Sequence, residues 1–383
     1  MTKLLIKNAN VVLNDAMLAG ADVLLSNGKI EKIEKNIVVD DVAVLDAQGK
    51  TMMPGFIDVH THGGMGVDFM NADAQGNTKV AEFFASKGTS SFLATTLTSS
   101  KESLMAALKA VGEAQELDYK GAEIIGVHME GPFFNVKYKG AQNPKYISNA
   151  MISDIKDYMN VKPGLLKMMS LAPEKEGALE AIKFMTQNDI ICSAGHSGAT
   201  YCEVCAAVEK GLTHGTHTFN GMTPLHHREP GMVGAIMLED KIYAEAIFDA
   251  IHLNPAIVKL LVKVKGIDKV ILITDSMQAV GLEDGRYDLG GLEVDVEGGA
   301  ARLLDGTLAG SCLTMEGALK NCVEYLELPL WDVAKMMSTN AAVHLGVNKG
   351  QIAVGYDADL VIVDELFSIS NTIVAGVEVF AAK

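Results

Sequence analysis

Metal-ligand side chains follow five short apolar runs of this 383-residue sequence, and their positions constrain the fold strongly. They are His60 and His62 in PGFIDVHTHGG, Glu130 in IIGVHMEGPF, His196 in IICSAGHSG, His217 in THGTHTFN and Asp275 in VILITDS. Side chains so far apart in sequence converge only if parallel strands carry them around one centre. A parallel barrel does this, because its strands all end at one face and the active site forms there. The pattern therefore predicts a barrel with a metal-dependent site.

The central part of the chain alternates between apolar runs and helical patterns. The expected strands occupy 56–60, 90–95, 124–129, 167–171, 190–194, 213–217, 243–248 and 270–274. Helical patterns such as VAEFFASKG and PAIVKLLVKVKG separate most of them. Eight strands with helices between them match an α/β fold of the (β/α)8 TIM-barrel type. Three long connections, at 131–148, 218–241 and 276–312, are expected to carry binding functions, and the last is either a lid or an insertion.

The two ends of the chain differ from its centre. Short β-rich pieces joined by Asn-Gly and Gly-Lys turns fill the first fifty residues, and the last thirty show the same pattern. We therefore expect a small β-sandwich domain built from residues 1–54 and 350–383. The metal-dependent barrel would occupy residues 55–349.

Composition excludes several classes of function. A formal net charge of −16 argues against binding of nucleic acid or of an anionic membrane. The start of the chain lacks the pattern of a signal peptide, and no apolar run is long enough to span a bilayer. The five cysteines have no framework spacing, and Cys202 and Cys205 lie in an expected helix, where we expect buried, reduced thiols. The expected compartment is the cytoplasm.

The joint placement of the ligand residues carries the argument, because a single histidine is more often an ordinary core or surface residue. His60 and His62 are two residues apart, so both point to one side of their strand. Imidazole nitrogen and carboxylate oxygen suit Zn²⁺, Fe²⁺ or Mn²⁺, and a set without thiolate favours a catalytic site. Asp275 is the obvious carboxylate for proton transfer. The residues alone predict metal-dependent hydrolysis or deamination of a C–N or C–O bond.

Several motifs resemble a known family. PGFIDVHTH and the closing GQIAVGYDADLVIVD resemble the amidohydrolase superfamily. The interior motifs HMEGPF, GHS, HTFNGM, REPG and LITDS resemble those of the N-acetylglucosamine-6-phosphate deacetylases, in the same order and over nearly the whole chain. The resemblance implies removal of acetate from N-acetylglucosamine 6-phosphate.

The resemblance also implies roles for the ligand residues. Glu130, His196 and His217 would hold the main metal, while His60 and His62 would help to hold a second one near Glu130. Asp275 would lie at the metal and act as the general base that activates water and then protonates the departing amine. The cofactor would be one or two divalent ions per subunit, zinc first, with iron, manganese or cobalt as alternatives.

The substrate-binding residues follow from the same resemblance. Arg228, His252 and the backbone around Asn220 and Gly221 would bind the sugar and its 6-phosphate, a site suited to a phosphorylated amino sugar. Ala141 and Gln142 in GAQNP would also contact substrate, although some members carry a histidine where Gln142 stands. Arg228 would reach across a homodimer interface into the neighbouring active site, whereas His226 and His227 receive no role.

The sequence leaves two other hypotheses about function open. One is a different amidohydrolase, such as a cyclic-amide hydrolase, a deaminase or a deacetylase of another amino-sugar phosphate. The other is a catalytically inactive barrel that serves only in assembly. The full set of ligands together with Asp275 argues against an inactive barrel.

Overall fold

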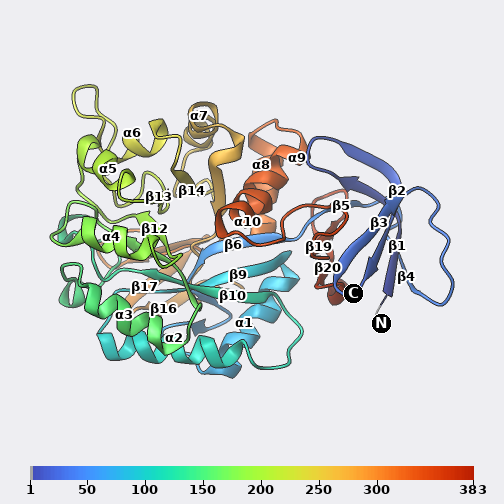
Figure 1. Cartoon of the computed structure of the whole chain (residues 1–383), viewed down its shortest axis with the longest axis horizontal. Coiled ribbons are helices and arrows are strands. Elements are labelled where there is room, and N and C mark those ends of the chain that lie inside the picture. Colours follow the sequence, from blue (N-terminus) through green and yellow to red (C-terminus); the bar gives the residue numbers. More distant parts are fainter. Residues whose placement is uncertain (1–2) are drawn as a thin grey trace.

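The structure is a computed structural model that describes residues 3–383. Figure 1 shows two parts side by side, a barrel surrounded by helices and a smaller group of strands in which both ends of the chain lie. Within residues 3–383, no helix is both long enough and apolar enough to cross a membrane.

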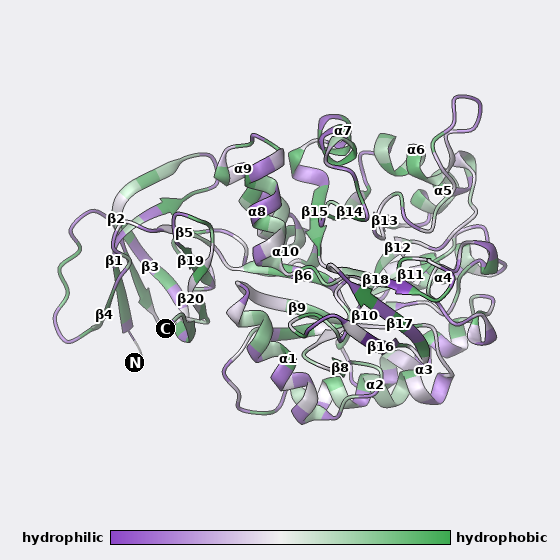
Figure 2. Cartoon of the chain, turned by 180° about the vertical axis from the view of Figure 1, so that it is seen from behind, coloured by the Kyte–Doolittle hydropathy of each residue, from purple (hydrophilic) through white to green (hydrophobic). Residues whose placement is uncertain are grey.

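Eight parallel strands form the barrel, and each is hydrogen-bonded to the next in chain order. They are β6 (Phe56–Thr61), β9 (Thr89–Thr96), β10 (Glu123–Glu130), β11 (Leu166–Leu171), β12 (Ile191–Ala194), β13 (Leu212–Gly215), β14 (Tyr243–Ile247) and β15 (Val270–Ile273). Every expected strand of the centre is present, so the (β/α)8 prediction is confirmed. Figure 2 shows β15 as hydrophobic along its length, as is typical of a parallel strand covered on both faces.

The first and last strands meet through hydrogen bonds near their carboxyl ends. The Asp275 amide donates to His60 O at 2.8 Å, and the His62 amide donates to Ser276 O at 2.8 Å. Deeper in the barrel, Thr274 Oγ1 donates to Asp58 Oδ2 at 2.6 Å. These bonds complete the ring of strands and bring the β6 ligands beside the end of β15.

Helices connect the barrel strands and cover the outside of the ring (Figure 1). They are α1 (Ala74–Ser86), α2 (Lys101–Ala114), α3 (Ile152–Val161), α4 (Ala178–Thr186), α5 (Tyr201–Val208), α6 (Gly231–Leu238), α7 (Pro255–Lys265), α8 (Met315–Tyr325), α9 (Leu330–Ala334) and α10 (Asn340–Leu345), with a π-turn at Lys335–Thr339 and short 3-10 turns at Val136–Tyr138, Pro144–Tyr146 and Ile267–Lys269. The local sequence determines where several of these helices begin. Thr200, for example, forms a capping box with Glu203 at the beginning of α5.

The expectation that Cys202 and Cys205 are buried is wrong, although both lie on a helix as predicted. Cys202 is exposed and Cys205 is half-buried. The reason is that α5 buries only a narrow face against the barrel, and Val204, Ala207 and Val208 form that face. All five cysteines are free thiols.

Strands from both ends of the chain form one continuous sheet. They are β1 (Lys3–Val12), β2 (Met17–Ser26), β3 (Lys29–Glu34), β4 (Ala43–Asp46), β5 (Thr51–Pro54), β19 (Leu360–Val363), β20 (Ile369–Val374) and β21 (Val377–Ala381). The two ends join where β19 pairs antiparallel with β5. Ile6, Val23, Met52 and Leu360 share one buried core within this sheet. The exact domain limits at 54/55 and 349/350 stay a prediction.

The long segment 276–312 forms a separate three-stranded antiparallel sheet of β16 (Gly285–Leu289), β17 (Leu292–Glu297) and β18 (Ala300–Leu303). A two-stranded ribbon, β7 (Gly63–Gly64) and β8 (Val67–Asp68), follows β6. Leu289, Thr307, Leu308 and Gly310 line the cavity described below. The insertion therefore forms part of the wall of the site.

Candidate active site

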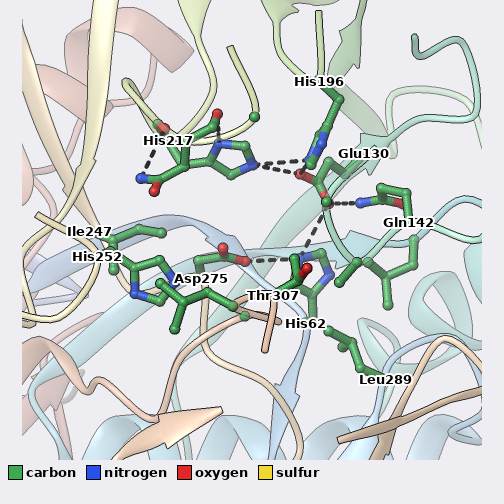
Figure 3. Close-up of a pocket in the computed structure, with 17 residues that line it drawn as sticks. His62, Glu130, Gln142, His196, His217, Ile247, His252, Asp275, Leu289 and Thr307 are labelled. Atoms are coloured by element: carbon green, nitrogen blue, oxygen red, sulfur yellow. Dashed lines mark hydrogen bonds and ion pairs between the residues drawn. The ribbon is translucent and has the colours of Figure 1, made fainter. Parts of the chain in front are cut away.

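A cavity of about 720 Å³, including its open mouth, lies at the carboxyl ends of the barrel strands. Its wall comprises His62, Leu97, Glu130, Gly140, Ala141, Gln142, His196, His217, Asn220, Gly221, Ile247, His252, Asp275, Leu289, Thr307, Leu308 and Gly310. Figure 3 shows that the labelled polar side chains converge from opposite sides. Nearly all residues singled out in the sequence thus meet at one place.

One group of ligand atoms consists of Glu130, His196 and His217. Glu130 Oε1 lies 3.0 Å from His196 Nε2 and 3.0 Å from His217 Nε2. The two Nε2 atoms are 3.2 Å apart (Figure 3). Two imidazole nitrogens and a carboxylate oxygen this close together form a candidate metal-binding group.

A second group consists of His60, His62 and Asp275. His62 Nε2 lies 3.0 Å from Asp275 Oδ1 and 3.4 Å from Glu130 Oε2. His60 Nε2 lies 3.5 Å from Asp275 Oδ1 and 3.6 Å from Glu130 Oε1. That nitrogen is buried and has no hydrogen-bond partner. Glu130, a member of the first group, therefore also lies close to the second.

The hydrogen bonds of the four histidines fix which ring nitrogen can bind a metal. Each Nδ1 faces an oxygen acceptor: Tyr138 O for His196 at 2.9 Å, Asn220 O for His217 at 3.2 Å, Thr95 O for His62 at 3.2 Å and Glu245 Oε2 for His60 at 3.0 Å. A carbonyl or carboxylate oxygen only accepts, so each Nδ1 donates. In the neutral ring, Nε2 then carries a lone pair directed at the site. The donor set therefore fits a divalent cation.

Backbone conformation also places these side chains. His196, His217 and Asp275 follow the ends of their strands with positive φ angles of 46°, 28° and 50°. Such angles are uncommon for residues other than glycine and cost on the order of 1–3 kcal/mol each. The turn at the strand end directs the side chains into the cavity.

The buried carboxylates and histidines of the site shift one another's pKa values. Burial would raise the pKa of Glu130, but His60 and the hydrogen bonds of His196 hold it well below its usual range. Burial would likewise raise the pKa of Asp275, but His60 and His62 lower it. In the absence of a metal, burial lowers the pKa of His60, and nearby carboxylates, Glu245 first, overcome this and raise it to about 10. The carboxylates are therefore ionised at neutral pH and available to a cation.

Four of the expected sugar-binding residues lie at the cavity. His252, Asn220, Gly221 and Ala141 all line it. Gly221 has φ 61°, and a Cβ there would lie 3.0 Å from His196 Nδ1, so a side chain would be strained and crowded. Glycine at this position lets the backbone approach the site closely.

Gln142 is bonded on both sides of its amide. Its Nε2 donates to Glu130 Oε2 at 2.5 Å, and its Oε1 accepts from the Thr98 amide at 2.8 Å. The side chain is buried, at 3% exposure. Its observed contacts hold Glu130, and a contact with substrate stays a prediction.

Arg228 does not reach the cavity of its own chain. It lies exposed in the connection between β13 and α6, where Nη1 contacts His227 Nε2 at 2.8 Å. Figure 1 shows a loop beside α5 and α6 projecting away from the barrel. His226 and His227 are exposed in the same connection.

Sequence reasoning missed several buried polar residues beneath the site. Glu245 on β14 bonds to both His60 and His214, and His128 Nε2 lies 2.7 Å from Ser170 Oγ. A signal for Glu245 was present, since it is the lone acidic residue of the apolar run YAEAIF. A charge in a fully covered strand requires a partner.

Comparison with known proteins agrees with this geometry. The model of the amidohydrolase family matches residues 51–379. The chain is similar to N-acetylglucosamine-6-phosphate deacetylase of Lysinibacillus sphaericus, with 40% identity over 374 residues and 97% of each chain covered. A solved structure of such a deacetylase from Thermotoga maritima has a TM-score of 0.89 at 37% identity, covering 99% of this chain and 100% of that one. A mutant deacetylase from Mycobacterium smegmatis in complex with N-acetyl-D-glucosamine-6-phosphate has a TM-score of 0.93 at 29% identity, with both chains fully covered. The barrel and these matches together show that the chain belongs to the amidohydrolase family.

Proposed function

We propose that this chain removes the acetyl group of N-acetylglucosamine 6-phosphate and releases acetate and glucosamine 6-phosphate. The observation that carries the proposal is that Glu130 of the first group also lies within 3.6 Å of His60 and His62, which belong with Asp275 to the second group. The similarity to deacetylases over nearly the whole chain supports the substrate.

In this proposal Glu130, His196 and His217 hold the main divalent ion, and His60 and His62 contribute to a second. Zinc is the first choice and iron, manganese or cobalt are alternatives, because the ligands are imidazole and carboxylate without thiolate. A bound ion of this kind lowers the pKa of water to about 7 and polarises the carbonyl.

Asp275 moves the proton. Its lowered pKa keeps the carboxylate ionised at neutral pH, and it lies within 3.0 Å of His62 at the centre of the site. It accepts the proton of the water that attacks the acetyl carbon, and it returns that proton to the amine nitrogen as the C–N bond breaks. An amine leaves poorly without a proton, so one group serves both steps.

The sugar and phosphate lie against other residues of the cavity. His252 and the backbone around Asn220 and Gly221 provide donors on the cavity side, with Ala141 beside them. Asp249 Oδ2 accepts from His252 Nδ1, which leaves Nε2 for the ligand.

Arg228 completes the phosphate site from a second copy of the chain. Its exposed position outside its own cavity supports this, since a guanidinium there is free to form a bidentate contact with a phosphate of a neighbour. The working unit is then a homodimer. The five free thiols suit a reducing compartment, and we place the reaction in the cytoplasm.

The decisive experiment measures acetate release together with metal content in the purified protein. N-acetylglucosamine 6-phosphate should be cleaved, whereas the unphosphorylated sugar should be a poor substrate. The galactosamine counterpart in parallel tests selectivity for the epimer. Ammonia release, or equal cleavage with and without phosphate, would favour another amidohydrolase activity. A protein with neither metal nor activity would be an inactive barrel.

A further inference from the structure

We propose that Glu245 is a positioning residue that holds ligands of both groups in place and so sets the affinity of the site for metal. The inference rests on the proposed metal site and concerns a residue outside it. Glu245 lies on β14, is fully buried and does not line the cavity, so it acts only through its neighbours.

Both oxygens of Glu245 are engaged. Oε2 accepts from His60 Nδ1 at 3.0 Å and from the His217 amide at 2.8 Å. Oε1 accepts from His214 Nε2 at 2.8 Å. One carboxylate therefore contacts the side chain of a ligand in one group and the backbone of a ligand in the other.

The bond to His60 differs in kind from those of the other three ligand histidines, whose Nδ1 atoms donate to neutral backbone carbonyls. A charged acceptor makes a hydrogen bond roughly twice as strong as a neutral one. It also makes the opposite ring nitrogen a better metal ligand. His60 Nε2, the buried atom without a partner, is that opposite nitrogen.

The bond to the His217 amide acts on backbone geometry. His217 has a φ of 28°, which a residue with a side chain adopts only when its surroundings hold it there. The amide of the next residue, Thr218, donates to the backbone oxygen of Glu245 at 2.9 Å. Glu245 thus holds the turn that directs His217 toward Glu130.

Two substitutions separate these contacts. Glu245→Gln keeps an oxygen that can accept from the His217 amide but removes the charge next to His60. Glu245→Leu removes both contacts. Asp359→Asn is a matched control, because Asp359 is also buried and ionically paired, but its side chain bonds to Lys349 and to the Ala375 amide and contacts no candidate ligand.

The test measures zinc affinity of the full chain. Metal-free wild type, variants and the His60→Asn background are titrated with zinc against a chromophoric chelator, and thermal melts verify folding. Glu245→Gln should lower the affinity for the zinc ion that depends on His60 by about 10- to 100-fold. In the His60→Asn background, Glu245→Gln should have little further effect on zinc affinity. Glu245→Leu should still lower the affinity for the remaining zinc ion in that background. Asp359→Asn should bind zinc as the wild type does.

The inference is overturned if Glu245→Gln and Glu245→Leu bind zinc with wild-type affinity. It is also overturned if Glu245→Gln has the same effect with and without His60. A wild type that binds no metal would refute the proposed function itself. A wild type that binds zinc and releases acetate while the variants bind zinc equally well would refute only the role of Glu245.

Discussion

His252 Nδ1 lies 2.7 Å from Asp249 Oδ2, and the pair holds the His252 ring in the wall of the cavity. The same carboxylate also accepts from the backbone amides of Ile251 and His252 through Oδ1. Burial would raise the pKa of Asp249, but the hydrogen bond and charge of His252 hold it below its usual value. An ionised Asp249 favours a His252 ring that can donate to a phosphate.

Asp249→Asn should therefore weaken binding of the phosphorylated substrate. We expect KM to rise about tenfold with a smaller change in kcat, because a hydrogen bond to a charged group contributes on the order of 1.5–3 kcal/mol and acts here on binding. Steady-state acetate release measures both constants. Equal losses with the phosphorylated and unphosphorylated sugars would contradict a role for His252 at the phosphate.

Asp275→Asn should nearly abolish acetate release. The amide cannot accept a proton, and general acid–base catalysis contributes about 10²- to 10⁴-fold. Asp118→Asn, an exposed substitution on the surface, serves as the control and should retain full activity. Near-wild-type turnover by a folded Asp275→Asn protein would exclude the proposed proton transfer.

Metal removal should abolish activity and lower the melting temperature. The reason is that Glu130, His196 and His217 place a carboxylate and two nitrogens within 3.2 Å of one another, an arrangement that a cation stabilises. Dialysis against a strong chelator, followed by activity and melting measurements, tests this. Adding zinc back should restore both, and a fully active protein without metal would refute the assignment of the ligands.

Mixing two inactive variants should restore activity if Arg228 acts across a dimer. Arg228→Ala would lack the phosphate contact, and Asp275→Asn would lack the proton carrier. A mixed dimer has one site with an intact Asp275 and an intact Arg228 from the partner subunit. After exchange of subunits, activity should approach about a quarter of the wild-type value, the share expected from random pairing in a symmetric dimer. If Arg228 served its own chain, no mixture would be active.

Thiol reactivity should follow burial. Cys202 is exposed, whereas burial raises the pKa of Cys192 to about 12 and also raises that of Cys322. Only the thiolate reacts readily, so alkylation of the folded protein at pH 8 should label Cys202 first and leave Cys192 and Cys322 unmodified. Peptide mapping by mass spectrometry reads out the order. Rapid labelling of Cys192 in the folded state would contradict the packing of β12 against α4.

Much of this architecture was accessible from the sequence, because its signals are local and repeated. Apolar runs such as VILI in β15 recur eight times with helical patterns between them, and each repeat is readable without knowledge of the others. The placement of His196 and Asp275 just past such runs was enough to predict that they meet. Parallel strands in a closed ring share one end, so residues at that end converge whatever the details.

Other features depended on contacts that no local pattern encodes. The bond of Glu245 to His60 joins residues 185 positions apart, and Gln142 reaches Glu130 only because the connection after β10 folds back over the site. The exposure of Cys202 depended on which narrow face of α5 packs on the barrel.

The sequence by itself determined the barrel and pointed to the candidate ligand residues, because strand periodicity and residue chemistry act locally. The tertiary structure alone decided how the ligands are oriented, with Glu130 close to both groups and Nδ1 of every ligand histidine bound to an acceptor. The physical reason is that the Nδ1 hydrogen bonds of His60, His62 and His196 join segments distant in sequence. Those bonds exist only after the barrel has brought the segments together.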